Sequence, residues 1–150
     1  MRILGIVVVP AAGRPRLAGA VVTGSVHDPV IEDSFLIKAP DGTPGEQAVD
    51  LARLLQAKLP GIAFDRAVIR TAGPAPVARR LKAQFSRAHA EGASLFVLRE
   101  HTDAEVTVGD TRYLAKHAGL TKDELEAKAS ALSGGNQDAL IAAIAGLPRE

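Results

Sequence analysis

The feature that most constrains the fold of this chain is the run from Arg2 to Pro10, which is almost wholly apolar and rich in β-branched residues. A continuous apolar run of this length is typical of a strand that is buried on both faces. Pro10 has no N–H to donate to a neighbouring strand, so we expect the strand to stop there. A strand of this kind needs a neighbour at each edge and a layer against each face, and the remaining residues must supply them.

The length and composition predict a single globular domain that spans residues 1–150. The chain has 150 residues, of which 47% are hydrophobic and 23% are charged, and a domain of this size can bury about two-thirds of its unfolded surface. The sequence contains no cysteine, which excludes disulfides, thiolate metal sites and cysteine nucleophiles. No run reaches the roughly 18 apolar residues of a membrane span, and the N-terminus lacks a signal-peptide pattern, so we expect a cytoplasmic protein without membrane contact.

Charge and aromatic content limit the kinds of partner that the chain can have. The formal net charge is +1, so attraction to nucleic acid would have to come from a local cluster of basic side chains. Aromatic residues make up only 3% of the chain, and there is no tryptophan. This composition argues against a platform that stacks the bases of a single strand.

Turn residues divide the N-terminal part of the chain into three strands. Gly and Pro residues within 10–16 and 24–29 mark turns, and apolar residues resume over 17–23 and 30–38. In the last of these segments Ile31, Phe35 and Ile37 are spaced to share one face. We expect the three strands to form an antiparallel meander.

The middle of the chain alternates between helix and strand patterns. Thr43-Pro44-Gly45-Glu46 has the pattern of a capping box with Pro at the first helical position, and a stripe at helical spacing follows, made of Ala48, Leu51, Leu55 and Leu59. A short buried strand is expected within 65–71. A helix over 76–90, capped by Gly92, and a fifth strand over 94–99 are expected next. The inner face of that helix is predicted to carry Val77, Leu81, Phe85 and Ala88.

The C-terminal residues indicate three short helices. One is expected over 111–117 and ends at Gly119. The second starts at the capping box Thr121-Lys122-Asp123-Glu124 and runs to about residue 132. Asn136 can cap the third, over 137–145.

This order of elements resembles the RNase H-like fold, and two short motifs narrow the resemblance. Arg2-Ile3-Leu4-Gly5-Ile6 is similar to the opening of RuvC-type Holliday-junction resolvases and their relatives, and the run from Asn136 to Ile144 is similar to their final helix. The stretch from Arg79 to Gly92 is similar in layout. The resemblance covers nearly the whole chain. It implies an α/β, RNase H-like domain with a five-stranded mixed sheet in the order 3-2-1-4-5 and helices packed on it.

The resemblance also implies where catalytic acids would lie. The family uses carboxylates that hold two divalent metal ions: one after the opening of the first strand, one on the fourth strand, and one or two at the start of the last helix. In this chain Val7 and Arg70 occupy the first two positions, and only Asp138 matches. One carboxylate cannot hold two Mg²⁺ ions in a catalytic geometry, and a nearby Arg opposes metal binding. We therefore expect no cofactor.

Asp138 and Asn136 also have simple structural explanations. An acid in the first turn of a helix is stabilised by the helix dipole, by roughly 0.3–1 kcal/mol. Asn is a common capping residue. Asp138 is accordingly a weak candidate for a catalytic residue.

A basic cluster is the candidate nucleic-acid site. The helix predicted over 76–90 carries cations on its outer face, namely Arg79, Arg80, Lys82 and Arg87, and the first hairpin adds Arg14 and Arg16. A phosphate-binding surface needs Lys and Arg gathered on one side of the molecule. The alternative interpretation is an ordinary solvated helix face.

Other functional classes have weaker signals. His27, His89 and His117 are scattered, and no pair of histidines has the spacing of a metal site. His101-Thr102-Asp103 follows the predicted fifth strand, a position at which α/β sheets often bind ligands. The serines lack the context of a nucleophile elbow, and the glycines form no phosphate-binding loop.

We therefore interpret the chain as a non-catalytic RNase H-like domain that binds nucleic acid, DNA or RNA, or a protein partner. One alternative is an active nuclease that uses Mg²⁺ and displaced carboxylates, with Asp65, Glu100 or Asp103 joining Asp138. Another is a structural or assembly protein, as a homodimer and without nucleic acid. Acids gathered at the strand ends favour the nuclease, a positive groove favours the binder, and a broad apolar patch favours the assembly protein.

Overall fold

A computed structural model of the chain describes residues 1–9, 14–73 and 81–150, the last range without the side chains of residues 81–83. Its centre is a sheet of five strands: β1 (Ile3–Val9), β2 (Arg16–Gly24), β3 (Pro29–Lys38), β4 (Arg66–Arg70) and β5 (Val106–Gly109). Their order is β3-β2-β1-β4-β5. The pairs β1–β2 and β2–β3 are antiparallel, and β4 is parallel to both β1 and β5. The predicted interior position of β1 and the predicted strand order are confirmed.

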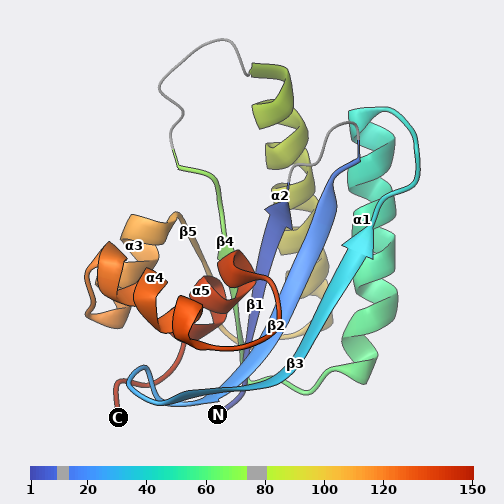
Figure 1. The fold of residues 1–150 in the computed structure, drawn as a ribbon. Coiled ribbons are helices and arrows are strands. Elements are labelled where there is room, and N and C mark those ends of the chain that lie inside the picture. The colour runs from blue at the N-terminus through green and yellow to red at the C-terminus, as the bar shows by residue number, and fades with distance from the viewer. Residues whose placement is uncertain (10–13, 74–80) are drawn as a thin grey trace.

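Helices cover both faces of this sheet (Figure 1). One face carries α1 (Pro44–Lys58), followed by the short helix η1 (Leu59–Gly61), and α2 (Leu81–His101). The other face carries α3 (Thr111–Ala118), α4 (Lys122–Ala131) and α5 (Gln137–Ala145). Side chains alternate along β1, so that Leu4, Ile6 and Val8 pack with α1 and α2 while Ile3 and Val7 pack with α5. This arrangement explains why the whole run is apolar, because both faces of β1 are buried.

The predicted helix boundaries in the C-terminal part are confirmed. Thr121 and Glu124 form a reciprocal capping box at the start of α4, and Thr43 and Glu46 do the same at α1. Gly119 ends α3 with a φ of 75°, in the left-handed region that favours glycine. Among the described helices, none combines the length and the apolar character that crossing a membrane requires.

The predicted fifth strand over 94–99 is wrong, because these residues lie inside α2. Ala90, Ser94, Val97 and Leu98 are buried, whereas Phe96 is 65% exposed. This burial follows the helical spacing of three to four residues, not the alternation of a strand. A short apolar run does not distinguish a strand from a helix by itself, and the actual β5 begins only at Val106. Gly92 accordingly lies within the helix and is not a cap.

The predicted inner face of the second helix is also wrong where the structure describes it. Phe85 is 60% exposed, and Ala88 is exposed too. The core contact of α2 comes from Ala90 onward, so the buried stripe has a different phase from the predicted one. Val77 and the side chain of Leu81 lie outside the described residues.

Candidate nucleic-acid interface

The two strand positions at which the resemblance implies acids are neighbours in the sheet. Val7 of β1 and Arg70 of β4 are partners in the parallel register. They lie toward the ends of their strands, and we call this end of the sheet, with the helix ends that cover it, the C-terminal edge. The opposite end, where β1 and β4 begin, is the N-terminal edge. Val7 is completely buried, so the C-terminal edge has an aliphatic and a cationic side chain where the resemblance implies two carboxylates.

The helix α5 begins close to these positions because it packs tightly on β1. A Cβ atom at Gly5 would collide with the backbone oxygen of Ala139, so only glycine permits this approach. Asn136 caps the helix: its Oδ1 accepts hydrogen bonds from the N–H groups of Asp138 at 2.9 Å and Ala139 at 3.1 Å. The predicted cap is confirmed, and it holds Asp138 in the first turn of the helix, beside Arg70.

Arg70 connects three elements at the C-terminal edge. Its Nη1 lies 3.5 Å from Oδ2 of Asp138, and its Nε donates a hydrogen bond of 2.6 Å to Oγ1 of Thr111. The side chain of Arg70 is 21% exposed and that of Asp138 is 45% exposed. The guanidinium therefore links β4 to the first residue of α3 and to the first turn of α5.

A second ion pair reaches the same edge from α2. Nε of Arg87 lies 3.6 Å from Oε2 of Glu91, and the two side chains are only 19% and 12% exposed. Glu91 also accepts a hydrogen bond from the N–H of Ala72, just beyond β4. Burial raises the pKa of Glu91, although this hydrogen bond and the charges of Arg87 and Arg70 oppose the rise. Burial also lowers the pKa of Arg87, an effect that the carboxylates of Glu91 and Asp138 oppose.

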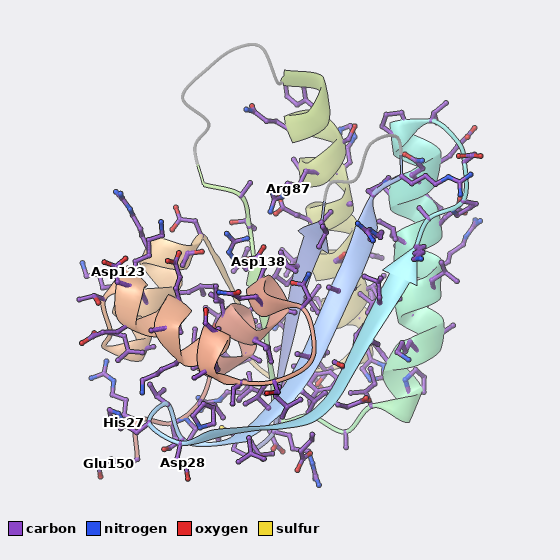
Figure 2. All side chains as sticks on the ribbon, viewed as in Figure 1. His27, Asp28, Arg87, Asp123, Asp138 and Glu150 are labelled. Carbon is purple, nitrogen blue, oxygen red and sulfur yellow. The ribbon has the colours of Figure 1, made fainter. Side chains whose placement is uncertain are left out.

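The predicted position of Arg87 on the outer face of its helix is therefore wrong, because the side chain is largely buried. The N-terminal half of α2 extends beyond the end of β4 (Figure 1), so Arg87 can reach the strand end. Figure 2 shows Arg87 near Asp138, although α2 and α5 cover opposite faces of the sheet. Because its charge is engaged in this half-buried cluster, Arg87 is not a freely exposed phosphate ligand.

Arg14 and Arg16, the other two predicted basic residues that the structure describes in full, differ in their surroundings. Arg14 is exposed, and its Nε and Nη2 donate to the carboxylate of Asp41 at 2.7 Å and 2.6 Å. The contact raises the pKa of Arg14 and lowers that of Asp41. Arg16 begins β2 opposite Val9. Its Nε is buried and has no hydrogen-bond partner among the described residues.

The remaining members of the predicted basic cluster are not described by the structure. Arg79 and Arg80 lie outside the described residues, and so does the side chain of Lys82. Their contribution to a basic cluster stays a prediction.

Two hollows lie along the C-terminal edge, one on each side of the start of α5. The first has a volume of about 490 Å³, and the charged side chains that line it are Arg70, Arg112, Lys122, Asp110 and Glu126. The second has a volume of about 360 Å³ and is lined in part by Arg16, Ser34, Phe35 and Asn136.

The two acids of the first hollow already have partners. Asp110 caps α3, where its Oδ1 accepts a 2.9 Å hydrogen bond from the N–H of Tyr113, and Glu126 lies 3.5 Å from Nζ of Lys122. Arg112 is exposed. Of the three cations that line the hollow, Arg70 and Lys122 are paired with Asp138 and Glu126, and Arg112 has no ion pair among the described residues.

The carboxylates considered as replacement ligands do not gather around Asp138. Asp65 lies at the N-terminal edge, where its Oδ2 accepts a 2.7 Å hydrogen bond from the N–H of Arg2. Glu100 and Asp103 lie at and just after the end of α2, before β5, which starts beside the start of β4. Among the described residues, no group of three or more His, Cys, Asp or Glu side chains is placed to hold a metal ion.

The histidines are also dispersed. His101 stacks on Phe64, with ring centroids 6.0 Å apart, near the N-terminal edge. Its predicted place at the end of a strand is wrong because the fifth strand lies farther along the chain. His27, in the turn between β2 and β3, lies at the end of the molecule opposite Arg87 and Asp138 (Figure 2).

Sequence reasoning did not identify Glu91 and Thr111 as residues of this site. The spacing of Arg87 and Glu91, one helical turn apart, is a signal that could have indicated the ion pair. No comparable signal exists for Thr111. Its contact with Arg70 depends on the pairing of Arg70 with Gly109 in the sheet, and the start of β5 was misplaced.

Comparisons with known proteins agree with this architecture. No protein-family model matches the sequence, and the comparison with curated proteins gives no match. A structure of Thermus thermophilus RuvC is similar to this chain with a TM-score of 0.66 and 16% identity, covering 97% of this chain and 92% of that one. A structure of T. thermophilus RuvC in complex with a Holliday junction substrate has a TM-score of 0.65 and 16% identity, covering 97% and 91%.

A structure of RNase H1 from the archaeon Halobacterium salinarum covers 84% of this chain and 98% of its own, with 14% identity and a TM-score of 0.39. The two RuvC structures and the sheet order together establish that this chain has the RNase H-like fold.

Proposed function

We propose that this protein is a non-catalytic RNase H-like domain that binds the phosphate backbone of nucleic acid along its C-terminal edge. The observation that carries the proposal is Arg70. This half-buried guanidinium occupies a strand position at which the family resemblance implies a metal-binding acid, and it pairs with Asp138, the one acid that matches.

The donor set at the C-terminal edge does not fit a pair of divalent ions. Mg²⁺ requires several oxygen ligands that converge on one point, and Val7 supplies none. Asp138 is within 3.5 Å of a guanidinium, which repels a second cation. These residues therefore do not support cleavage through a pair of metal ions.

The two hollows suit phosphate groups better than metal ions. Arg16 has a buried Nε without a partner among the described residues, and Arg112 lines the larger hollow beside Arg70. Guanidinium and ammonium groups are the usual ligands of phosphate oxygens. The similar RuvC structure that holds a Holliday junction substrate adds support for nucleic acid as the ligand class.

The proposal is tested by measuring the anisotropy of fluorescently labelled DNA and RNA as protein is added. Wild-type binding should weaken with salt, and log K should fall by roughly 0.9 per phosphate contact per log unit of salt on duplex DNA. The variant Arg16→Gln/Arg112→Gln should bind more weakly and with a shallower salt slope. The matched control Arg2→Gln/Arg66→Gln removes the same charge from the N-terminal edge and should bind like the wild type. Absence of binding at low salt, or equal loss in both variants, would contradict the proposal.

The non-catalytic part of the proposal needs its own test. Purified protein is incubated with branched and linear DNA and RNA in the presence of Mg²⁺ or Mn²⁺, and no cleavage is expected. Cleavage that is lost in Asp138→Asn would instead favour the nuclease alternative.

A second candidate function is assembly into a homodimer through α2, and the exposed phenylalanines of that helix favour it. Phe85 and Phe96 are 60% and 65% exposed and lie about three helical turns apart on one side. Ala88 and Gly92 between them are exposed as well. Analytical ultracentrifugation should then show a dimer that Phe96→Lys dissociates and Val30→Lys, on the exposed part of β3, leaves intact. A monomeric wild type would eliminate this candidate.

A further inference from the structure

Two aromatic rings are exposed together at the C-terminal edge. Tyr113 and His117 lie one turn apart on α3, with ring centroids 6.4 Å apart and ring planes only 17° from parallel. Tyr113 is 55% exposed, and His117 is exposed too. The low aromatic content of the chain predicts no stacking platform, but composition counts rings without regard to where they lie.

Gly109 determines where the ring of Tyr113 lies. A Cβ atom at Gly109 would collide with the tyrosine ring, whose Cγ would be 2.9 Å away, so the ring rests against the end of β5. Gly109 is the register partner of Arg70 in the parallel pair β4–β5. Side chains at paired positions of a parallel sheet point to the same face, so the ring lies on the face to which Arg70 points, one strand farther along the edge.

The exposed charged side chains of α3 are positive, and the acid Asp110 precedes them as the cap that accepts a hydrogen bond from the N–H of Tyr113. Arg112 and Lys116 are exposed neighbours of the rings on α3, and residues 111–118 contain no acid. Arg112, the residue before Tyr113, lines the hollow beside Arg70 to which we assign phosphate binding, although neither ring belongs to its lining. A nucleic acid whose phosphates occupy that hollow would bring its bases close to the rings.

The geometry points to a base-stacking platform: Tyr113, aligned with His117, stacks an unpaired base of a nucleic acid whose backbone is held by the neighbouring cations. This inference rests on the proposed function and narrows it to nucleic acids with unpaired bases, such as single strands or the open centre of a branch. Stacking on an aromatic ring tolerates any base, because every base has a π face. The platform therefore selects unpaired over paired structure and does not select sequence.

The chain offers a direct reporter of this contact. Tyr113 is the only tyrosine, and there is no tryptophan, so the tyrosine emission of the whole protein comes from this one ring. Single-stranded DNA and single-stranded RNA of the same sequence should quench the emission as they bind. A blunt duplex of that sequence should bind through its phosphates and leave the emission largely unchanged. Tyrosine amide mixed with the same nucleic acids corrects for their absorbance.

Variants separate stacking from backbone binding. Tyr113→Leu should weaken the affinity for single strands by at least about five-fold and leave the affinity for the blunt duplex unchanged, both measured by anisotropy. Tyr113→Phe keeps the ring and should retain wild-type affinity. Val30→Ala removes apolar surface from a position on β3 that is 52% exposed, close to the 55% of Tyr113, and should have no effect. Circular dichroism and thermal unfolding verify that each variant is folded.

The possible outcomes distinguish this inference from the proposed function. Binding of single strands without quenching, or with equal affinity for wild type and Tyr113→Leu, would overturn the platform and leave phosphate binding intact. Equal quenching by the duplex would overturn the selectivity for unpaired bases. Failure of every nucleic acid to bind at low salt would overturn both proposals.

Discussion

The Arg2–Glu32 and Arg66–Glu105 pairs of the N-terminal edge lie in water, whereas the C-terminal edge combines exposed pairs, such as Arg14–Asp41, with one pair that is largely removed from water. At the N-terminal edge, Arg2 contacts Glu32 at 2.7 Å, with 52% and 36% of the two side chains exposed. At the C-terminal edge, Arg87 and Glu91 are 3.6 Å apart with less than a fifth of either side chain exposed. The shorter contact therefore belongs to the pair that lies in water.

Burial, not distance, decides how much the loss of each ion pair would change the stability of the protein. Water screens the exposed pair, so it contributes little to stability. Removal of one partner from a half-buried pair leaves a charge without compensation, which is costly. The covering helices make the difference, because α5 and α2 both reach over the C-terminal edge. That edge therefore holds one ion pair away from water, whereas the Arg2–Glu32 and Arg66–Glu105 pairs of the N-terminal edge are exposed.

The largest loss of stability is expected at Gly5, where α5 packs against β1. Gly5→Ala should lower the free energy of unfolding by about 3 kcal/mol, because the added methyl group would overlap the backbone of α5. Urea unfolding measures the change. The control Gly45→Ala adds the same group in α1 where nothing lies within 4 Å, and it should be neutral or slightly stabilising. If Gly5→Ala were as stable as the wild type, α5 would not cover the C-terminal edge as described.

The next effect concerns the half-buried ion pair. Arg87→Met should cost about 2 kcal/mol, because Glu91 would remain half-buried without its partner. The double variant Arg87→Met/Glu91→Gln should recover part of this loss. At the N-terminal edge Arg66→Met breaks an exposed pair with Glu105 and should cost less than about 1 kcal/mol. Equal losses for Arg87→Met and Arg66→Met in urea unfolding would remove the distinction between the two edges.

A smaller effect is expected in the pH dependence of stability. Burial raises the pKa of Glu91 above its ordinary value of 4.5, so the folded protein binds this proton more tightly than the unfolded chain does. The stabilisation from this group is therefore complete below about pH 4.5 and is lost as the pH rises through the folded-state pKa. Relative to wild type, Glu91→Gln should become progressively more stable over that rise, as measured by urea unfolding at a series of pH values.

The exposed Asp41 provides a comparison of opposite sign. Arg14 lowers the pKa of Asp41 below its ordinary value of 3.8, so that stabilisation is present above pH 3.8 and is lost as the pH falls through the folded-state pKa. Asp41→Asn should therefore lose stability relative to wild type as the pH rises through this range. The same direction of change in both variants would mean that burial does not govern Glu91.

The smallest effect is expected at the exposed pair of the N-terminal edge. Arg2→Gln should give an unfolding curve that superimposes on that of the wild type at physiological salt, because water and ions screen the contact with Glu32. The comparison is made at low and at high salt. A clear loss of stability that persists at high salt would show that this edge, too, depends on its ion pairs.

Local signals explain which parts of the fold could be predicted. The capping residues Thr43, Thr121 and Asn136 mark helix starts because each interacts with residues only two or three positions away. The apolar run of β1 indicates its central position for a similar reason, since every residue of a doubly buried strand must be apolar. The misplaced fifth strand shows the limit of this reasoning, because Leu95 to Leu98 satisfy the composition of a strand as well as that of a helix.

The candidate site likewise combines properties that the sequence determines with properties that only the tertiary structure decides. Sequence alone determined that Val7 and Arg70 are not acids and that Asp138 follows a cap, because identities and caps are local properties. Only the tertiary structure decided that Arg70 contacts Asp138 and Thr111 and that Arg87 lies half-buried beside Glu91.

The stacked rings at the end of β5 also depend on both the sequence and the tertiary structure. The one-turn spacing of Tyr113 and His117 is visible in the sequence, but their place beside Arg70 depends on strand pairing. That pairing joins residues about forty positions apart, such as Arg70 and Gly109. The physical reason is that the desolvation of a side chain and its distance from other charges depend on which distant segments cover it. The pattern of residues along the chain does not show which segments those are.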